Sequence, residues 1–383
     1  MTRIASVKAY AVSAPLQHPL WTAHELLHSS SVILVEIQTD DGLTGIGQIH
    51  GAPLKVICDW VERLGALVRG MDALAQVVVW EHLFSLTSPR ALGMGGRDGL
   101  PPPLPRSDRP FIMAAIGGID IALWDIKGKA AGVPVWRLLG GSADPVFTYA
   151  TGGYYDLNAP LTACADELAG FVARGYQAVK LKTAGLTIAE EVQRIAATRS
   201  AIGPDTLLML DMNAAYNLDD CIHFAHEVEP FNITWLEEPL HWHLQPADFV
   251  RLAHATNIPL AHGEREMTRF TARDFIDSGA LRYMQFDATR FAGFTESLRV
   301  SYLAEQQGVI IAPHLVPEIH AHLVSAFPQR SFGVESHGGP ERDPLWFELF
   351  KERAQVRDGR VHMNSLPGFG FEIDWAVVKK YAA

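Results

Sequence analysis

The stretch "AVKLKT", residues 178–183, sets two lysines around one leucine inside an apolar segment. The segment is predicted to be a β-strand, on which successive side chains point to opposite faces. Lys180 and Lys182 therefore project to the same side, with backbones about 7 Å apart, the length of two strand rises. Two lysines on one strand face are usually solvated surface residues, so a functional role depends on what neighbouring strands place beside them.

This strand is the first of seven similar segments that alternate with helical stretches, after a helical segment around residues 114–139. The seven are "AVKLKT", "LLMLDMN", "ITWLEEPL", "IPLAHGE", "YMQFDATR", "VIIAPHL" and "SFGVES". Their polar ends recur roughly every 21 to 29 residues, about one βα unit each. A strand at residues 146–150 precedes them, and no GxGxxG fingerprint follows any strand. The pattern therefore predicts a parallel βα barrel rather than a doubly wound sheet.

The N-terminal part has a different pattern, typical of a small α+β unit. Residues 15–30, with three histidines, are expected to form a long connection that serves as a lid. Residues 88–110, rich in Gly and Pro, are expected to form a loop. The other expected elements are strands at 4–12, 31–38 and 43–49 and helical periodicity over 54–84.

Composition narrows the class of protein. The chain has 383 residues, 48% of them hydrophobic and 20% charged, enough for one large barrel or two domains. A formal net charge of −11 argues against a nucleic-acid surface. The three cysteines form no CxxC pair, and neither a signal peptide nor a long apolar run is present. We expect a cytoplasmic homo-oligomer that binds no membrane or nucleic acid.

Three consecutive strand ends supply carboxylates: Asp211, Glu237 and Glu264. In a βα barrel these ends meet at one mouth, where active sites lie. Because three acids without compensation repel one another, a bound divalent cation is expected, and oxygen ligands suit Mg²⁺. Asn213 shares the face of Asp211 and is expected to line the pocket, whereas Glu238 alternates to the other face and is expected to be structural.

The later strand ends supply groups for proton transfer. Asp287 and His314 end consecutive strands, and a neighbouring aspartate raises the basicity of a histidine. Glu335, on the last strand, could donate a proton or hydrogen bond if burial and nearby acids keep it neutral. Glu341 and His337 are alternatives for that role.

The two lysines are expected to complete this site from another wall. One would stabilise developing negative charge on a metal-bound oxyanion. The other would act as a neutral base, because the adjacent cation and the metal lower its pKa.

These motifs together resemble the enolase superfamily, in its mandelate racemase subgroup. The resemblance spans nearly the whole chain and rests on "VKLKT", "DMN", "WLEEP", "HGE", "FDATR", "APHLVPEIHAHL" and "GGIDIALWDIKGKAAGVPVWRLLGG". It implies a modified TIM barrel, (β/α)₇β, at residues 126–339 under an α+β capping domain at 1–125, with residues from about 340 to 383 packing back on the cap.

The resemblance also implies a shared first step, removal of the proton α to a carboxylate. It implies Mg²⁺ on Asp211, Glu237 and Glu264. The implied catalytic residues are Lys182 as one base, Lys180 as enolate stabiliser, His314 held by Asp287 as acid or base on the other face, and Glu335 on the substrate carboxylate.

Two enzyme functions fit these residues. The first is an acid-sugar dehydratase that removes the α-proton of an aldonate or aldarate and eliminates the β-hydroxyl, giving a 2-keto-3-deoxy acid. Its support is the set of extra polar candidates for substrate binding: His24, His28, Arg265, Arg290 and His337. The second is a racemase or epimerase of a 2-hydroxy acid, favoured by Trp21 and Leu26 in the expected lid. A binding protein that kept the fold and lost the chemistry is a third alternative.

Overall fold

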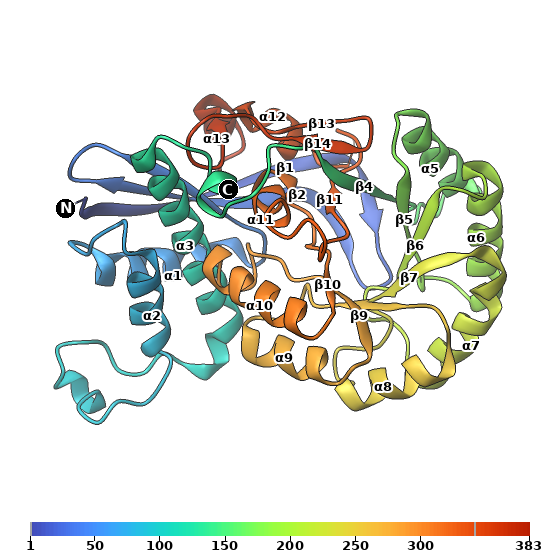
Figure 1. The fold of residues 1–383 in the computed structure, drawn as a ribbon, viewed down its shortest axis with the longest axis horizontal. Coiled ribbons are helices and arrows are strands. Elements are labelled where there is room, and N and C mark those ends of the chain that lie inside the picture. The colour runs from blue at the N-terminus through green and yellow to red at the C-terminus, as the bar shows by residue number, and fades with distance from the viewer. Residues whose placement is uncertain (1, 341) are drawn as a thin grey trace.

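The N-terminal part of the computed structural model, which describes residues 2–340 and 342–383, is a three-stranded antiparallel sheet covered by helices (Figure 1). Strand order in this sheet is β1-β2-β3. Its elements are β1 (Ile4–Trp21), β2 (Leu26–Thr39), β3 (Thr44–Ile49), α1 (Leu54–Val68), α2 (Gln76–Ser85) and α3 (Arg109–Ala131). We call this part the cap.

The expectation of a long connecting loop over residues 15–30 was wrong. β1 and β2 pair from Ile4 opposite Thr39 to Trp21 opposite Leu26, with register shifts, and only a short turn joins them. A ladder needs only backbone partners, so polar and apolar residues alike extend it. The hairpin nevertheless reaches the barrel, because the carbonyl of Trp21 accepts a hydrogen bond from the Tyr155 amide at 2.9 Å. By contrast, the expected loop at 88–110 is confirmed, with two short 3₁₀ turns at Met94–Gly96 and Arg106–Asp108.

The second part is the predicted barrel, with eight parallel strands in the order β4 to β10 and with β11 paired to β4. A parallel bridge between Ile311 and Ser331 joins β10 to the segment before β11, which closes the ring. Seven helices alternate with these strands, as a (β/α)₇β barrel requires. The strands are β4 (Val146–Gly152), β5 (Ala178–Lys182), β6 (Leu207–Asp211), β7 (Ile233–Glu237), β8 (Leu260–His262), β9 (Leu281–Met284), β10 (Ile310–Ile311) and β11 (Val334–Ser336). The helices are α5 (Ala163–Ala173), α6 (Ile188–Ile202), α7 (Leu218–Val228), α8 (Pro246–Ala255), α9 (Arg269–Asp277), α10 (Phe294–Gln306) and α11 (Pro317–Val324).

A layer of buried side chains fills the barrel interior below its mouth. Its members are Tyr149, Ala178, Met209, Trp235, Ala261 and Ala312. This layer is a packed floor, so polar groups at the carboxyl ends of the strands face a closed compartment rather than a channel. No helix among the described residues has the length and apolar character needed to span a bilayer.

The C-terminal segment lies beside both parts (Figure 1). Strand β14 pairs with β4 of the barrel, whereas Ala382 forms a bridge with Val12 of β1. The elements of this segment are α12 (Pro344–Glu348), β12 (Phe350–Glu352), β13 (Gln355–Arg357), β14 (Arg360–His362), β15 (Glu372–Ile373) and α13 (Trp375–Lys380); the short helix α4 (Val135–Leu138) precedes the barrel.

Two glycines allow β3 to lie directly on α3. A Cβ atom at Gly47 would sit 2.0 Å from the carbonyl oxygen of Gly118, and one at Gly45 would sit 2.2 Å from that of Ala122. Both obstacles are helix backbone, which cannot move aside as a flexible side chain could. The cap therefore depends on the absence of side chains at these positions.

We predict that Gly47→Ala lowers the free energy of unfolding by about 1–3 kcal/mol or more, as overpacking does. Urea unfolding followed by circular dichroism measures this. The matched control is Gly170→Ala in α5, where an added Cβ meets nothing within 4 Å. The control should leave stability unchanged or raise it, because alanine is the better helix former. Equal stability of both variants would contradict the close-packing argument.

Candidate active site

Barrel register brings the predicted site residues into one buried layer. Lys182, Asp211 and Glu237 are the last residues of β5, β6 and β7, and each is the register partner of the next. Glu264 follows β8 by two residues and is also buried. The strand-end pattern seen in the sequence therefore corresponds to real proximity at one mouth.

Two ammonium groups lie among these carboxylates. Lys182 Nζ is 2.5 Å from Asp211 Oδ2. Lys180 Nζ is 3.5 Å from the same oxygen and 3.0 Å from Glu335 Oε1, and it also donates to Glu237. Lys180 is fully buried above the ring of Tyr149, 5.7 Å from its centroid. Buried charges persist only when they are paired, and each lysine here is paired.

The expectation that Lys182 has a lowered pKa was wrong for this arrangement. Burial and the neighbouring Lys180 do lower the pKa of Lys182, but Asp211, Tyr154 and Glu264 together raise it above the ordinary value. The expectation considered only the cations near Lys182. In the structure, the nearby carboxylates have the larger effect on its pKa.

The expected neutral state of Glu335 was also wrong. Burial alone would raise its pKa, but the Lys180 ammonium and His314 lower it below the ordinary value. Its carboxylate accepts a hydrogen bond from the hydroxyl of Thr151. Glu335 is therefore an ionised partner of Lys180 rather than a proton donor. The alternative Glu341 lies outside the described residues.

The carboxylate set fits a divalent cation chemically. Burial and the neighbouring carboxylates, Asp211 among them, raise the pKa of Glu237 to about 8 despite its bond to Lys180. Glu264 Oε2 is buried without a hydrogen-bond partner. In the described residues, however, no group of three or more His, Cys, Asp or Glu side chains is arranged to hold a metal ion, and Lys180 lies between Asp211 and Glu237. Binding a cation therefore requires the lysines to give up these contacts.

The expected contact between Asp287 and His314 is present. Asp287 Oδ2 is 3.1 Å from His314 Nδ1, and Nε2 of the same ring is 3.3 Å from Glu264 Oε2. Burial lowers the pKa of His314, but Glu264 and Asp287 together raise it above the ordinary value. Asp287 is held as an acceptor by the amide and hydroxyl of Thr289 at 2.8 and 2.7 Å. The geometry thus orients one ring nitrogen of His314 toward the carboxylate layer.

The expected substrate-binding residues divide into two groups. Asn213 and Arg290 lie in the site: the backbone N–H of Asn213 donates to Asp211 Oδ1 at 2.9 Å, and Arg290 Nη1 is 3.3 Å from Glu264 Oε1. Arg265 is instead held by Glu238, with Nε 3.0 and 3.1 Å from its two oxygens. His24, on the hairpin turn, lies 3.1 Å from the carbonyl of Ala214 through Nε2.

Three residues near the site escaped the sequence analysis. Thr151 and Tyr154 follow the expected strand at 146–150 by only a few residues, so a longer strand assignment would have found them. Tyr154 contacts two cations, since Lys182 Nζ lies 5.6 Å and Arg342 Cζ 4.6 Å from its ring centroid. His50 follows β3 in the cap, and no local pattern indicates that this strand end reaches the barrel.

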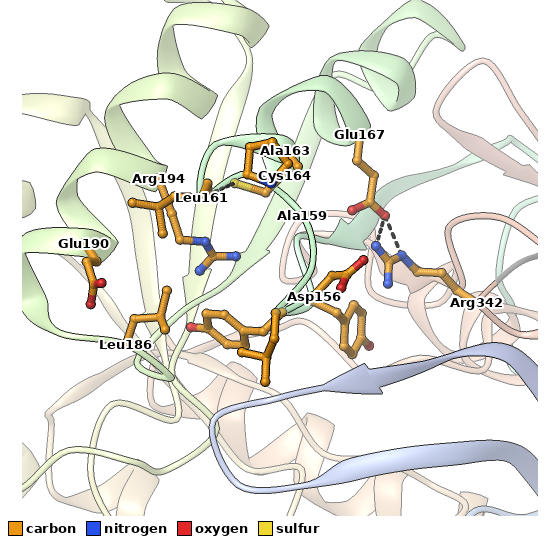
Figure 2. Close-up of a pocket in the computed structure, with 14 residues that line it drawn as sticks. Asp156, Ala159, Leu161, Ala163, Cys164, Glu167, Leu186, Glu190, Arg194 and Arg342 are labelled. Atoms are coloured by element: carbon orange, nitrogen blue, oxygen red, sulfur yellow. Dashed lines mark hydrogen bonds and ion pairs between the residues drawn. The ribbon is translucent and has the colours of Figure 1, made fainter.

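A pocket of about 330 Å³ lies behind Tyr154, between the β4–α5 connection and α6. Figure 2 shows Arg342 and Glu167 joined across one side of it, while Arg194 projects from the opposite side. Arg194 is nearly fully buried and already bonded to Glu191 and two carbonyl groups. Arg194 is therefore not available to bind an anionic ligand in this pocket. The pocket borders the site only through Tyr154.

Comparison with known proteins gives the family. The model of the mandelate racemase/muconate lactonizing enzyme N-terminal domain matches residues 4–140, and the enolase C-terminal domain-like model matches residues 163–377. The L-talarate/galactarate dehydratase of Salmonella typhimurium is 30% identical, covering 97% of this chain and 89% of that protein. The D-galactarolactone cycloisomerase of Agrobacterium fabrum is 33% identical, covering 97% of both chains.

Solved structures agree with this result. The Salmonella typhimurium dehydratase, crystallised with Mg and L-lyxarohydroxamate, superposes with a TM-score of 0.86 at 29% identity, covering 100% of this chain and 93% of that one. A magnesium complex from a marine actinobacterium gives a TM-score of 0.85 at 26% identity, covering 100% of both chains. The predicted fold and family are thus confirmed: the chain belongs to the mandelate racemase subgroup of the enolase superfamily.

Proposed function

We propose that this protein is an acid-sugar dehydratase that uses Lys182 and His314 as its two proton-transfer groups. The observation that carries the proposal is their placement: Lys182 ends β5, His314 follows β10, and both contact the carboxylate layer. A carboxylic acid held at this layer would have its α-carbon between a primary amine and an imidazole. This arrangement suits removal of a proton on one side and its delivery on the other.

The chain's own residues perform the following steps. The Lys182 amine takes the α-proton, and the C–H electron pair moves into the carboxylate to form an enediolate. Lys180 stabilises the added negative charge, the type of contact whose loss costs about 2.7–4 kcal/mol in comparable sites. The electron pair then returns to expel the β-hydroxyl, which takes a proton from His314 Nε2 and leaves as water. The resulting enol ketonises to the 2-keto-3-deoxy acid.

Residues Asp211, Glu237 and Glu264 would hold Mg²⁺. When bound, the ion supplies Lewis-acid polarisation of the substrate carboxylate and neutralises the acids that otherwise keep the lysines protonated. The raised pKa of Glu237 comes first from burial and then from neighbouring carboxylates, whose negative charge a bound cation would neutralise. Asp287 is a positioning residue in this scheme, because it fixes the tautomer and orientation of the His314 ring.

Several relatives support dehydration. Their names include L-talarate/galactarate, arabinonate and D-galactonate dehydratases, at 27–31% identity. A cavity of about 260 Å³ is lined by polar residues, among them His50, Glu264 and Arg290, and by apolar ones such as Ile57, Phe111 and Met267. Its polar groups offer hydrogen-bonding partners to a hydroxylated substrate. Cycloisomerases and a racemase are among the relatives as well. The experiment below therefore also distinguishes racemisation and cycloisomerisation from dehydration.

Incubation with a panel of aldonic and aldaric acids tests the reaction. We expect at least one acid to give a 2-keto acid, measured by semicarbazone absorbance, and to exchange its α-proton in ²H₂O. Exchange with inversion but without keto acid would identify a racemase and overturn the dehydratase. An isomeric product without water loss would identify a cycloisomerase. Neither exchange nor product with any acid would refute the proposed function.

The substitution His314→Asn distinguishes the role of His314 from that of Lys182. We expect dehydration to fall by a factor of about 10² to 10⁴, the usual contribution of a general acid, while Lys182 still exchanges the α-proton. Lys182→Ala should lose both processes. Nuclear magnetic resonance of the same sample measures exchange and product together. Full dehydration by His314→Asn would show that the acid lies elsewhere.

Removal of divalent cations should abolish turnover and lower thermal stability. Mg²⁺ at 100 times its Kd should stabilise the fold by about 2.7 kcal/mol, because it binds only the native state. Asp211→Asn should lose this stabilisation in calorimetry. The control is Asp219→Asn, an exposed acid on α7, which should keep it. Stabilisation that survives Asp211→Asn would place the cation elsewhere.

A further inference from the structure

A second pair of histidine and aspartate lies at the barrel mouth, apart from Asp287 and His314. His337 follows β11, and its Nδ1 is 2.6 Å from Asp343 Oδ2. The mechanism above uses neither residue. Both are held in place from three parts of the chain, which suggests a function beyond filling space.

Asp343 acts as a fixed acceptor. Its Oδ1 accepts hydrogen bonds from the Ser30 hydroxyl of β2 at 2.5 Å and from the Trp346 amide at 3.0 Å. Burial alone would raise the pKa of Asp343, but His337 and these donors lower it to about 2. The carboxylate is therefore ionised near neutral pH, and it holds the proton of His337 on Nδ1.

The other nitrogen of His337 has no partner. Its ring stacks on Trp346, with centroids 4.9 Å apart and planes 20° from parallel, so it cannot rotate freely. The side chain is only 7% exposed, and Nε2 is buried without a hydrogen bond to any described residue. A buried, unsatisfied nitrogen is costly, so a hydrogen-bond partner for Nε2 is expected.

The position of His337 indicates where that partner lies. His337 is two residues beyond Glu335, whose side chain faces Lys180, so both residues project toward the mouth. The His337 ring centroid is 6.4 Å from that of His50, which lines the cavity of about 260 Å³ that reaches Glu264 and Arg290. His337 thus lies next to His50, the cap residue that lines this cavity.

The chemistry of Nε2 limits the ligand. Nδ1 is engaged by Asp343, so Nε2 is the ring atom left to bond a ligand. A hydroxyl group, which both donates and accepts, can pair with it. His50 adds a polar group without positive charge, because burial lowers its pKa to about 4.

We propose that His337, positioned by Asp343, forms a hydrogen bond through Nε2 with a hydroxyl group on the part of the substrate chain beyond the β-carbon. This residue then selects for a substrate that carries a hydroxyl group at that point. The inference rests on the proposed function, because it assumes an acid-sugar substrate. Ser30 links the contact to the cap, so substrate selection depends on cap and barrel together.

The test uses an acid that the wild-type enzyme accepts, together with its monodeoxy analogues at each carbon beyond the β-carbon. The readout is kcat/KM for α-proton exchange. In the wild type, kcat/KM for one analogue should be lower than that for the parent by a factor of about ten or more, because the buried nitrogen loses its hydrogen-bond partner. In His337→Phe, which keeps a ring on Trp346, the parent should fall to the level of that analogue.

The control is His322→Phe. His322 is a buried histidine whose nitrogens already contact the Trp136 amide and the Phe369 carbonyl, each at 3.1 Å, so its loss should leave the ratio of parent to analogue unchanged. If His337→Phe does not fold, Asp343→Asn gives the same comparison, with a reduced ratio expected. An unchanged ratio in the folded variant overturns the inference. Absence of exchange with every acid in the wild type refutes instead the proposed function.

Discussion

Compensation of buried charge is the constraint on which the rest of this structure depends. Asp211, Glu237 and Glu264 end neighbouring strands, and closure of the barrel forces them into one layer without room for bulk water. Like charges at this distance cannot all remain ionised unless cations join them. Lys180 and Lys182, on the neighbouring strand β5, provide those cations. Mg²⁺, which the family uses, is another cation that can neutralise the same acids.

The packed floor and the cap make this layer reactive. Tyr149 and Trp235 close the barrel from below, so electrostatic interactions in the layer are stronger than at a surface. The cap closes the site from above through its β1–β2 hairpin and the end of β3. Because Ser30 and His50 come from the cap, their contacts with Asp343 and His337 form only when cap and barrel are docked.

Much of the fold and of the candidate site followed from the sequence because parallel strands in a barrel all end at one mouth. Polar strand ends could therefore be collected from a linear pattern, as for Lys182, Asp211 and His314. The long β1–β2 hairpin was missed, because polar residues in a two-stranded ribbon show no clear alternation. The pKa directions of Lys182 and Glu335 were missed for another reason: they depend on how many acids surround each group, and this number is set by packing.

The sequence by itself determined the barrel, the order of its polar strand ends and the family, since each depends on local periodicity and short motifs. Only the tertiary structure decided which charges pair, that Arg265 is engaged by Glu238, and that His337 meets Asp343 while one of its nitrogens stays free. These contacts join segments far apart in the chain. Their energies depend on burial and distance, which no local pattern encodes.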